Sequence, residues 1–421
     1  MATLKAIGSG VKGILTGTPK RITWGPELAT GLDRLKFGLY VKWEDRSFFE
    51  ILQAAKDEAR EINDSVPVSF SDNGDMVFNC HPAGRKGGYT YGISRADVNI
   101  FFSRRLDDTT PNIWIDIGSS SCWSPGYKFI ISEILSFVAH LKGHILRDTV
   151  SEAHLCTDFI GLDIEELPLD RYDHWITRAN HYQSYQTRSQ ISGISLAQSE
   201  GTLPPGAMVR ESGIEFGRGD IMLRIYDKTL ELQKNPAKQS LFASVWNRSK
   251  FDEGHVTRVE FQLRRPVLRQ LGINTLKDLE KKKTGAWKYC THEWVRLSVA
   301  PVDRKNRHQD RAIMHPWWEM VQSVDLCTNN RQAVTRKKVL TSKSIDVLAD
   351  MMAGCALSIG TILNRKEHEL ELVIAFGQGC LENRIRRMFK ETTNSGKNLF
   401  EHKMRKRWSE IWPLGYVPEP V

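Results

Sequence analysis

Two stretches near the middle of the chain carry the pattern that decides the fold. They are residues 214–231, Ile-Glu-Phe-Gly-Arg-Gly-Asp-Ile-Met-Leu-Arg-Ile-Tyr-Asp-Lys-Thr-Leu-Glu, and residues 257–265, Thr-Arg-Val-Glu-Phe-Gln-Leu-Arg-Arg. Each contains an alternation of apolar and polar side chains, which is typical of a β-strand. They also carry a tyrosine, a lysine and two carboxylates that a metal-assisted tyrosine nuclease could use: Tyr226, Lys228, Glu231 and Glu260.

Strand geometry predicts which of these side chains can meet. Side chains two positions apart point to the same face of a strand, so Arg224, Tyr226 and Lys228 share one face. Arg258 and Glu260 share a face of the second stretch for the same reason. If the two stretches pair as neighbours, Tyr226 and Glu260 meet over one pocket. The alternative is that the tyrosine packs and the Lys/Glu pair is a solvated ion pair.

A tyrosine oxygen attacks a phosphodiester only where the charge on both groups is neutralised. Lysine, arginine and a divalent cation can do this, and carboxylate ligands suit Mg²⁺ or Mn²⁺. An earlier strand-like run offers Asp158 and Asp163 as further ligands. Their odd separation puts them on opposite faces of a regular strand, so at most one is expected in the site.

Composition favours an anionic partner and a reducing compartment. The 421-residue chain has a net charge of +9, which favours nucleic acid or an anionic membrane, and 40% hydrophobic residues, enough for a sizeable core. Its seven cysteines form no Cys-x-x-Cys pair, so we expect neither a disulfide framework nor a zinc ribbon. The longest uncharged run, 351–364, is too short to span a bilayer and is predicted to be a buried helix. With no apolar leader at the N-terminus, we expect a cytoplasmic protein without a membrane partner.

The pattern along the chain predicts an α+β fold. We expect an antiparallel sheet core with flanking helices, in two pseudo-repeated halves, and a basic helical C-terminal region. The expected domains are a flexible basic arm (1–30), a main domain (31–325) and the C-terminal region (326–421). Helices are predicted over 46–63, 126–147, 170–185 and 276–294, and a loop or hairpin connection over 187–205.

Several motifs, in order, resemble the Rep_trans family of rolling-circle replication initiators, which serve plasmids and filamentous phages and are related to integrative-element relaxases. The central motif is Arg224-Ile-Tyr-Asp-Lys-x-x-Glu231 followed by Arg258-Val-Glu260. The other similar pieces are Tyr89-x-Tyr-Gly92, Trp114-Ile-Asp-Ile-Gly-Ser-Ser-Ser-Cys122, Cys156-Thr-Asp-Phe-Ile-Gly-Leu-Asp163 and His315-Pro-Trp-Trp318. The resemblance implies a DNA nickase that forms a 5′-phosphotyrosine bond through Tyr226, with Lys228 stabilising charge. It implies a metal site among Asp158, Glu231 and Glu260.

The expected partner is origin DNA, single-stranded or extruded as a hairpin. Arg258 and the basic C-terminal region are candidate DNA contacts, although that region could also be a solvated helix surface. Its candidate residues are Arg384, Arg386, Arg387, Lys403, Arg405, Lys406 and Arg407. Because the chain lacks a Gly-x-x-x-x-Gly-Lys-Ser/Thr motif, a host helicase would have to unwind the duplex.

Ending a round of replication requires a second nucleophile. Tyr182 and Tyr185 lie three apart on a predicted helix, where packing or base stacking is the favoured interpretation. Only Tyr226 has the motif, so we expect a second subunit of a homodimer to supply the second tyrosine. Two other functions remain open: a relaxase of an integrative conjugative element, and a DNA-binding regulator without catalysis.

Overall fold

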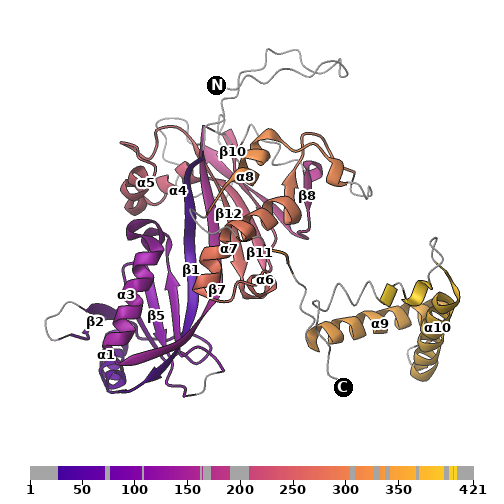
Figure 1. Cartoon of the computed structure of the whole chain (residues 1–421), viewed down its shortest axis with the longest axis horizontal. Coiled ribbons are helices and arrows are strands. Elements are labelled where there is room, and N and C mark those ends of the chain that lie inside the picture. Colours follow the sequence, from indigo (N-terminus) through magenta and orange to yellow (C-terminus); the bar gives the residue numbers. More distant parts are fainter. Residues whose placement is uncertain are drawn as a thin grey trace, which may run out of the picture. The chain divides into compact units, whose positions relative to one another are not determined.

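The structure is a computed structural model. It describes residues 27–71, 76–106, 109–161, 164, 172–189, 208–303, 309–326, 332, 334–336, 342–366, 369–392, 398–401 and 403–404. The chain divides into two compact units, Met1–Val334 and Thr335–Val421. The first contains a large antiparallel sheet flanked by helices and the second is helical, so the predicted α+β class is confirmed (Figure 1).

An 11-stranded sheet in the order β2-β3-β4-β5-β6-β1-β7-β12-β11-β10-β9 organises the first unit. The long strands β1 and β7 pair with each other in its middle. The strands are β1 (Glu27–Trp43), β2 (Val66–Ser69), β3 (Val77–Cys80), β4 (Tyr91–Arg95), β5 (Val98–Phe102), β6 (Ile113–Ile117), β7 (Gly143–Ile160), β9 (Tyr182–Ser189), β10 (Met208–Phe216), β11 (Ile221–Asp227) and β12 (Val256–Arg264). A small second sheet pairs β8 (Trp175–Thr177) with β13 (Val295–Leu297).

The helices of the first unit connect these strands. They are α1 (Phe48–Ile62), α2 (Ser119–Ser121), α3 (Tyr127–His140), α4 (Lys228–Gln233), α5 (Gln239–Val245), α6 (Arg265–Gln270), α7 (Leu276–Tyr289) and α8 (Pro316–Ser323). Figure 1 shows α1 and α3 beside the strands of the N-terminal half, and α6 and α7 beside β7 and β12.

Alternation along the strands separates an apolar face of the sheet from a polar one. In β1, Leu35, Phe37 and Leu39 are buried, while Arg34 and Lys36, on either side of Leu35, are exposed and half-buried. The apolar face packs against helices: the Phe261 ring of β12 meets Trp287 of α7 edge-on, 5.2 Å between centroids. Burying one such side chain contributes about 1.5–3 kcal/mol, which holds the helices to this face. The opposite, polar face therefore holds the charged side chains of the central strands.

The structure corrects three predicted boundaries. The expected helix over 170–185 is instead a short turn, β8 and the start of β9. The expected helix over 126–147 ends at His140, because Lys142 adopts a left-handed backbone (φ 57°) that starts β7. β1 begins at Glu27, so the last residues of the expected arm 1–30 are strand. Of the expected loop 187–205, residues 187–189 belong to β9 and residues 190–205 lie outside the described residues.

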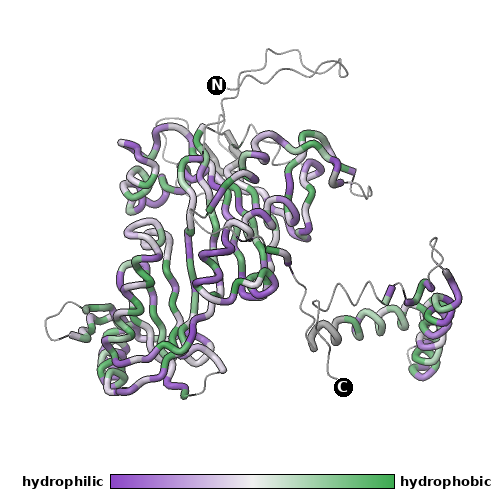
Figure 2. Tube along the Cα trace, viewed as in Figure 1, coloured by the Kyte–Doolittle hydropathy of each residue, from purple (hydrophilic) through white to green (hydrophobic). Residues whose placement is uncertain are grey.

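The second unit contains α9 (Ser342–Ile362) and α10 (Leu370–Lys390), which pack together. The contact is close, because a Cβ on Gly377 would lie 2.6 Å from Cβ of Ala356. Figure 2 shows hydrophobic stretches along both helices. The segment 351–364 is largely helical but not buried as predicted, since Met351 is 63% exposed. Among the described residues, no helix has both the length and the apolar character needed to cross a bilayer.

Candidate active site

The β11–β12 pairing brings Tyr226 and Glu260 together. Arg224 lies opposite Glu260 and Tyr226 lies opposite Arg258, so Tyr226 and Glu260 are diagonal neighbours on the polar face. Diagonal neighbours on a sheet are within reach of long side chains. The Tyr226 hydroxyl donates a 3.1 Å hydrogen bond to Oε2 of Glu260. The predicted meeting of these two residues is therefore present in the structure.

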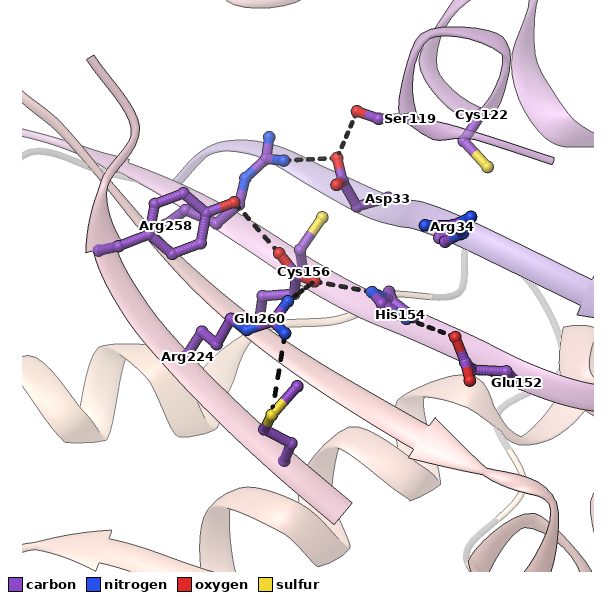
Figure 3. A network of polar contacts seen from close by, with 12 residues as sticks. Asp33, Arg34, Ser119, Cys122, Glu152, His154, Cys156, Arg224, Arg258 and Glu260 are labelled. Carbon is purple, nitrogen blue, oxygen red and sulfur yellow. Dashed lines mark hydrogen bonds and ion pairs between the residues drawn. The ribbon is translucent and has the colours of Figure 1, made fainter. Parts of the chain in front are cut away.

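Glu260 is the start of a buried polar chain across the sheet (Figure 3). Its Oε1 lies 2.8 Å from Nδ1 of His154, whose Nε2 lies 3.0 Å from Glu152. Lys36 donates to the same Glu152 oxygen at 2.7 Å. Burial works against charge on His154, but its hydrogen bonds to the two carboxylates raise its pKa above the usual value. Both ring nitrogens therefore face carboxylate oxygens that stabilise a charged ring.

The ionisation of Tyr226 and Glu260 is shifted in opposite senses. Burial, followed by the charge of Glu260, raises the pKa of Tyr226 well above its usual value. Burial disfavours the charged form of Glu260, yet the hydrogen bond and charge of His154, with Arg258, hold its pKa below the usual value. Both shifts favour a phenol that donates to a carboxylate, and both raise the free energy of moving the proton from Tyr226 to Glu260 in this arrangement.

Lys228 starts a helix rather than continuing the strand as predicted. Asp227 caps α4 by accepting from the backbone N–H of Leu230 at 2.9 Å, so β11 ends there. Lys228 is buried, and its Nζ lies 2.5 Å from Oε2 of Glu231 one turn later. Burial and the charge of Arg258 lower its pKa. The helix start thus places Lys228 and Glu231 beside Tyr226.

Asp158, a predicted metal ligand, and Arg258, a predicted DNA contact, form a buried ion pair with each other. They lie opposite each other on β7 and β12, with Nε of Arg258 2.6 Å from Oδ1 of Asp158. Both side chains are 0% exposed. Oδ2 of Asp158 accepts from Nη2 of Arg258 and from the indole of Trp246, each at 2.8 Å. Trp246, at the end of α5, covers this end of the polar face, which corrects both predictions.

Asp33 joins the site from a distant part of the sequence. It lies at an irregularity in the β1–β7 pairing, between Leu32 opposite Leu155 and Arg34 opposite His154. Such bulges redirect a side chain. Asp33 accepts hydrogen bonds from Ser119 (2.8 Å) and Trp123 (2.9 Å) and pairs with Arg258. Despite burial, the charges of Arg258 and Lys228 hold its pKa well below the usual value.

A cavity of about 450 Å³ collects these side chains. Five of the sequence-predicted residues line it: Arg224, Tyr226, Lys228, Glu231 and Glu260. The lining also includes residues that sequence reasoning missed: Asp33, Arg34, Asp97, Asn99, His154 and Lys238. A usable signal was present in β1, where the adjacent charges of Asp33 and Arg34 interrupt the apolar–polar alternation. The turn after β6, Gly118 to Ser120, completes the wall.

The other predicted residues lie elsewhere or outside the described part. Trp317 and Trp318 of the similar Pro-Trp-Trp piece are fully buried and belong to the core. On α10 the three arginines are exposed and paired within the helix region: Arg386 with Glu382 (2.6 Å), and Arg387 (2.9 Å) and Arg384 (3.9 Å) with Glu391. Lys403 is exposed. Asp163, Arg405, Lys406 and Arg407 lie outside the described residues.

The donor types in the cavity suit a hard divalent cation, but with a different ligand set from the predicted one. Asp158 is excluded, because both of its oxygens are bonded to buried donors. Four carboxylates line the cavity: Asp33, Asp97, Glu231 and Glu260. Within the described ranges, no three His, Cys, Asp or Glu side chains stand around a common point. Holding a cation would require these carboxylates to turn from their present partners.

Comparison with known proteins gives a distant structural likeness and no match to a sequence family. No protein-family model matches the chain, and no curated protein sequence matches it. Among solved structures, the chain is similar to a rolling circle replication initiator protein from Geobacillus stearothermophilus, with 12% identity and a TM-score of 0.38. The match covers 72% of this chain and 99% of that chain.

Proposed function

We propose that this chain cuts and rejoins one strand of origin DNA through Tyr226. The observation that carries the proposal is the 3.1 Å hydrogen bond from Tyr226 to Glu260, in a cavity that Lys228 and Arg224 also line. A role in rolling-circle replication rests on the resemblance of the Arg224–Glu231 and Arg258–Glu260 motifs to those of rolling-circle initiators. Because a phosphotyrosine link keeps the energy of the broken bond, rejoining needs no ATP.

The cutting step is a transesterification. Glu260 takes the proton of the Tyr226 hydroxyl as its oxygen attacks the phosphorus, so no free phenolate has to form. A bond forms between Tyr226 Oη and phosphorus while the bond from phosphorus to the 3′ oxygen breaks. The 3′ oxygen leaves with a proton relayed through water from protonated Glu260, which gives a free 3′-OH and a 5′-phosphotyrosine and restores the Glu260 carboxylate. General-base assistance of this kind contributes about 10²–10⁴-fold.

His154 keeps Glu260 ready for this step. Placed between Glu152 and Glu260, it holds Oε1 of Glu260 and leaves Oε2 facing Tyr226. Lys228 and Arg224 supply positive charge where the pentavalent phosphate gains negative charge. Arg224 is partly exposed and its Nη1 lies 3.7 Å from Glu260, so it can contact a bound phosphate while it stays beside Glu260.

A divalent cation, Mg²⁺ or Mn²⁺, would be held by Asp33 and Glu231, which leaves Glu260 free to accept the proton of Tyr226. When bound, it would add Lewis-acid stabilisation of charge on the phosphate oxygens. DNA outside the cavity would contact the arginines of α10, Arg384, Arg386 and Arg387, together with Lys403. A host helicase would open the duplex, and a homodimer is the proposed assembly.

The test uses purified full-length protein, end-labelled single-stranded DNA carrying one origin cleavage site, and Mn²⁺ or Mg²⁺. We expect a covalent adduct on the 5′ side of the cut that disappears in Tyr226→Phe and with EDTA. Loss of the adduct in Glu260→Gln with DNA binding retained would support the proton-acceptor role. Binding of the correct origin without any adduct would instead identify a DNA-binding regulator.

A further inference from the structure

A second tyrosine lies in the same row of the sheet as Tyr226. In the β9–β10 pairing Tyr185 is opposite Gly213, and in the β10–β11 pairing Gly213 is opposite Tyr226. Neighbouring strands lie about 4.8 Å apart, so the two tyrosine backbones are separated by about 10 Å. The residue between them is a glycine, so no side chain divides the two rings on the polar face.

The surroundings of Tyr185 repeat those of Tyr226. Its hydroxyl donates a 3.0 Å hydrogen bond to Oε2 of Glu215, as Tyr226 donates to Glu260. Arg224 lies between the two carboxylates, with Nε 3.4 Å from Glu215 and Nη1 3.7 Å from Glu260. Two tyrosine–glutamate pairs therefore share one arginine.

Both tyrosines also line one cavity of about 360 Å³, together with Glu215, Arg224, Glu231 and Lys234. β9 is the last strand of the sheet order, and Tyr185 is 40% exposed there. Tyr182, three residues earlier on the same strand, turns the other way and packs on Phe216 at 5.2 Å between ring centroids. Tyr182 is therefore a packing residue, whereas the ring of Tyr185 lies at an accessible cavity.

We propose that Tyr185 is a second nucleophile, which accepts a second DNA strand while Tyr226 still holds the first. The proposal rests on the proposed function of Tyr226. It replaces the expected donation of a tyrosine by a second subunit, because one chain places both groups beside Arg224. Tyr226 makes the first cut because Lys228 and Glu231 stand beside it.

The second transfer balances without a further reactant. Glu215 takes the proton of Tyr185, whose oxygen attacks the phosphorus at the second site. The Tyr185 Oη–phosphorus bond forms, the bond from phosphorus to the 3′ oxygen breaks, and the proton held by Glu215 passes to that oxygen, which releases a new 3′-OH. That 3′-OH attacks the phosphorus on Tyr226, forming a phosphodiester and returning a proton to Tyr226. The first strand leaves joined, and the second stays on Tyr185.

The experiment uses the full chain with a first origin strand to load Tyr226 and then a second, differently labelled origin strand. Digestion and mass spectrometry identify which tyrosine peptide carries each label, and gel analysis measures joined first strand. Wild type should yield a Tyr226-linked first label, a Tyr185-linked second label and joined product. Tyr185→Phe should still load the first strand but lower the ratio of joined product to first adduct at least about 100-fold. Tyr182→Phe is the matched control and should behave as wild type.

The two proposals fail differently in this experiment. A Tyr226→Phe protein that loads the first strand would overturn the proposed function. Joined product from Tyr185→Phe at the wild-type ratio, or a second label on any other residue, would overturn the role of Tyr185 alone. A mixture of Tyr185→Phe and Tyr226→Phe chains should stay inactive in joining; restored joining would show that the second tyrosine comes from another subunit.

Discussion

Gly213 lies directly opposite Tyr226 where β10 pairs with β11, and a side chain at this position would collide with the tyrosine. A Cβ built on Gly213 lies 2.9 Å from Cβ of Tyr226 and 2.8 Å from the carbonyl oxygen of Ile225. The backbone oxygen cannot move aside without disturbing the strand pairing. The absence of a side chain at Gly213 is therefore part of the site.

Gly213→Ala should lower stability by about 1–3 kcal/mol through this overpacking and displace Tyr226 from Glu260. We expect the rate of covalent adduct formation to fall at least about tenfold, measured on single-stranded origin DNA. The control is Gly219→Ala in the turn after β10, where a Cβ meets nothing within 4 Å. Equal rates in the two variants would contradict the role of the close approach.

The Arg258–Asp158 pair is expected to contribute to stability rather than to DNA binding. Arg258→Met leaves Asp158 buried without its partner, a change that costs about 3–5 kcal/mol. Urea unfolding monitored by tryptophan fluorescence measures the loss. Arg264→Met, at the exposed end of the same strand, is the control and should change stability by less than about 1 kcal/mol. A stable Arg258→Met protein with weakened DNA binding would restore the original prediction.

Glu152 should make stability depend on pH in the acid range. Burial raises its pKa, but hydrogen bonds from His154 and Lys36 outweigh this and lower the pKa from 4.5 to about 2. Because the folded pKa lies below the unfolded one, the stabilisation is complete above about pH 4.5 and is lost as pH falls toward 2. Glu152→Gln should therefore lower the free energy of unfolding by about 1–3 kcal/mol near neutral pH. The melting temperature should fall most in the same pH range.

The measurement for Glu152 is the melting temperature of both proteins from acid to neutral pH. The gap between wild type and Glu152→Gln should close as pH falls through this window, and comparing the two removes the contribution of other carboxylates. A gap that widens in acid would reverse the assigned sign.

The arginines of α10 should contribute electrostatically to DNA affinity. Replacing Arg384, Arg386 and Arg387 with alanine should weaken binding of single-stranded DNA and reduce its salt dependence by about 0.7 per lost phosphate contact. Fluorescence anisotropy across a salt series gives both quantities. The control replaces three exposed, paired cations of the first unit, Arg60, Lys128 and Lys142. The same loss in both triple variants would indicate only a general effect of net charge.

The residues of the cavity were only partly predictable from the sequence. Parity along two strands predicted that Tyr226 and Glu260 meet, and their hydrogen bond is present. The same parity put Lys228 on the strand, but the Asp227 cap ends β11 and begins a helix. Tyr185 was assigned to a helix, where its relation to Tyr226 could not be recognised.

By itself, the sequence determined the alternating strands, the α+β class and the reactive groups on neighbouring stretches, because alternation and parity are local properties of the backbone. Only the tertiary structure decided that Asp33 and His154 join the cavity, since they come from β1 and β7, far away in the sequence. It also decided that Trp246 bonds to Asp158, the partner of Arg258, and that β9 brings Tyr185 into the row of Tyr226. The physical reason is that strand order, bulges and the covering of a face depend on long-range packing, which no short stretch of sequence encodes.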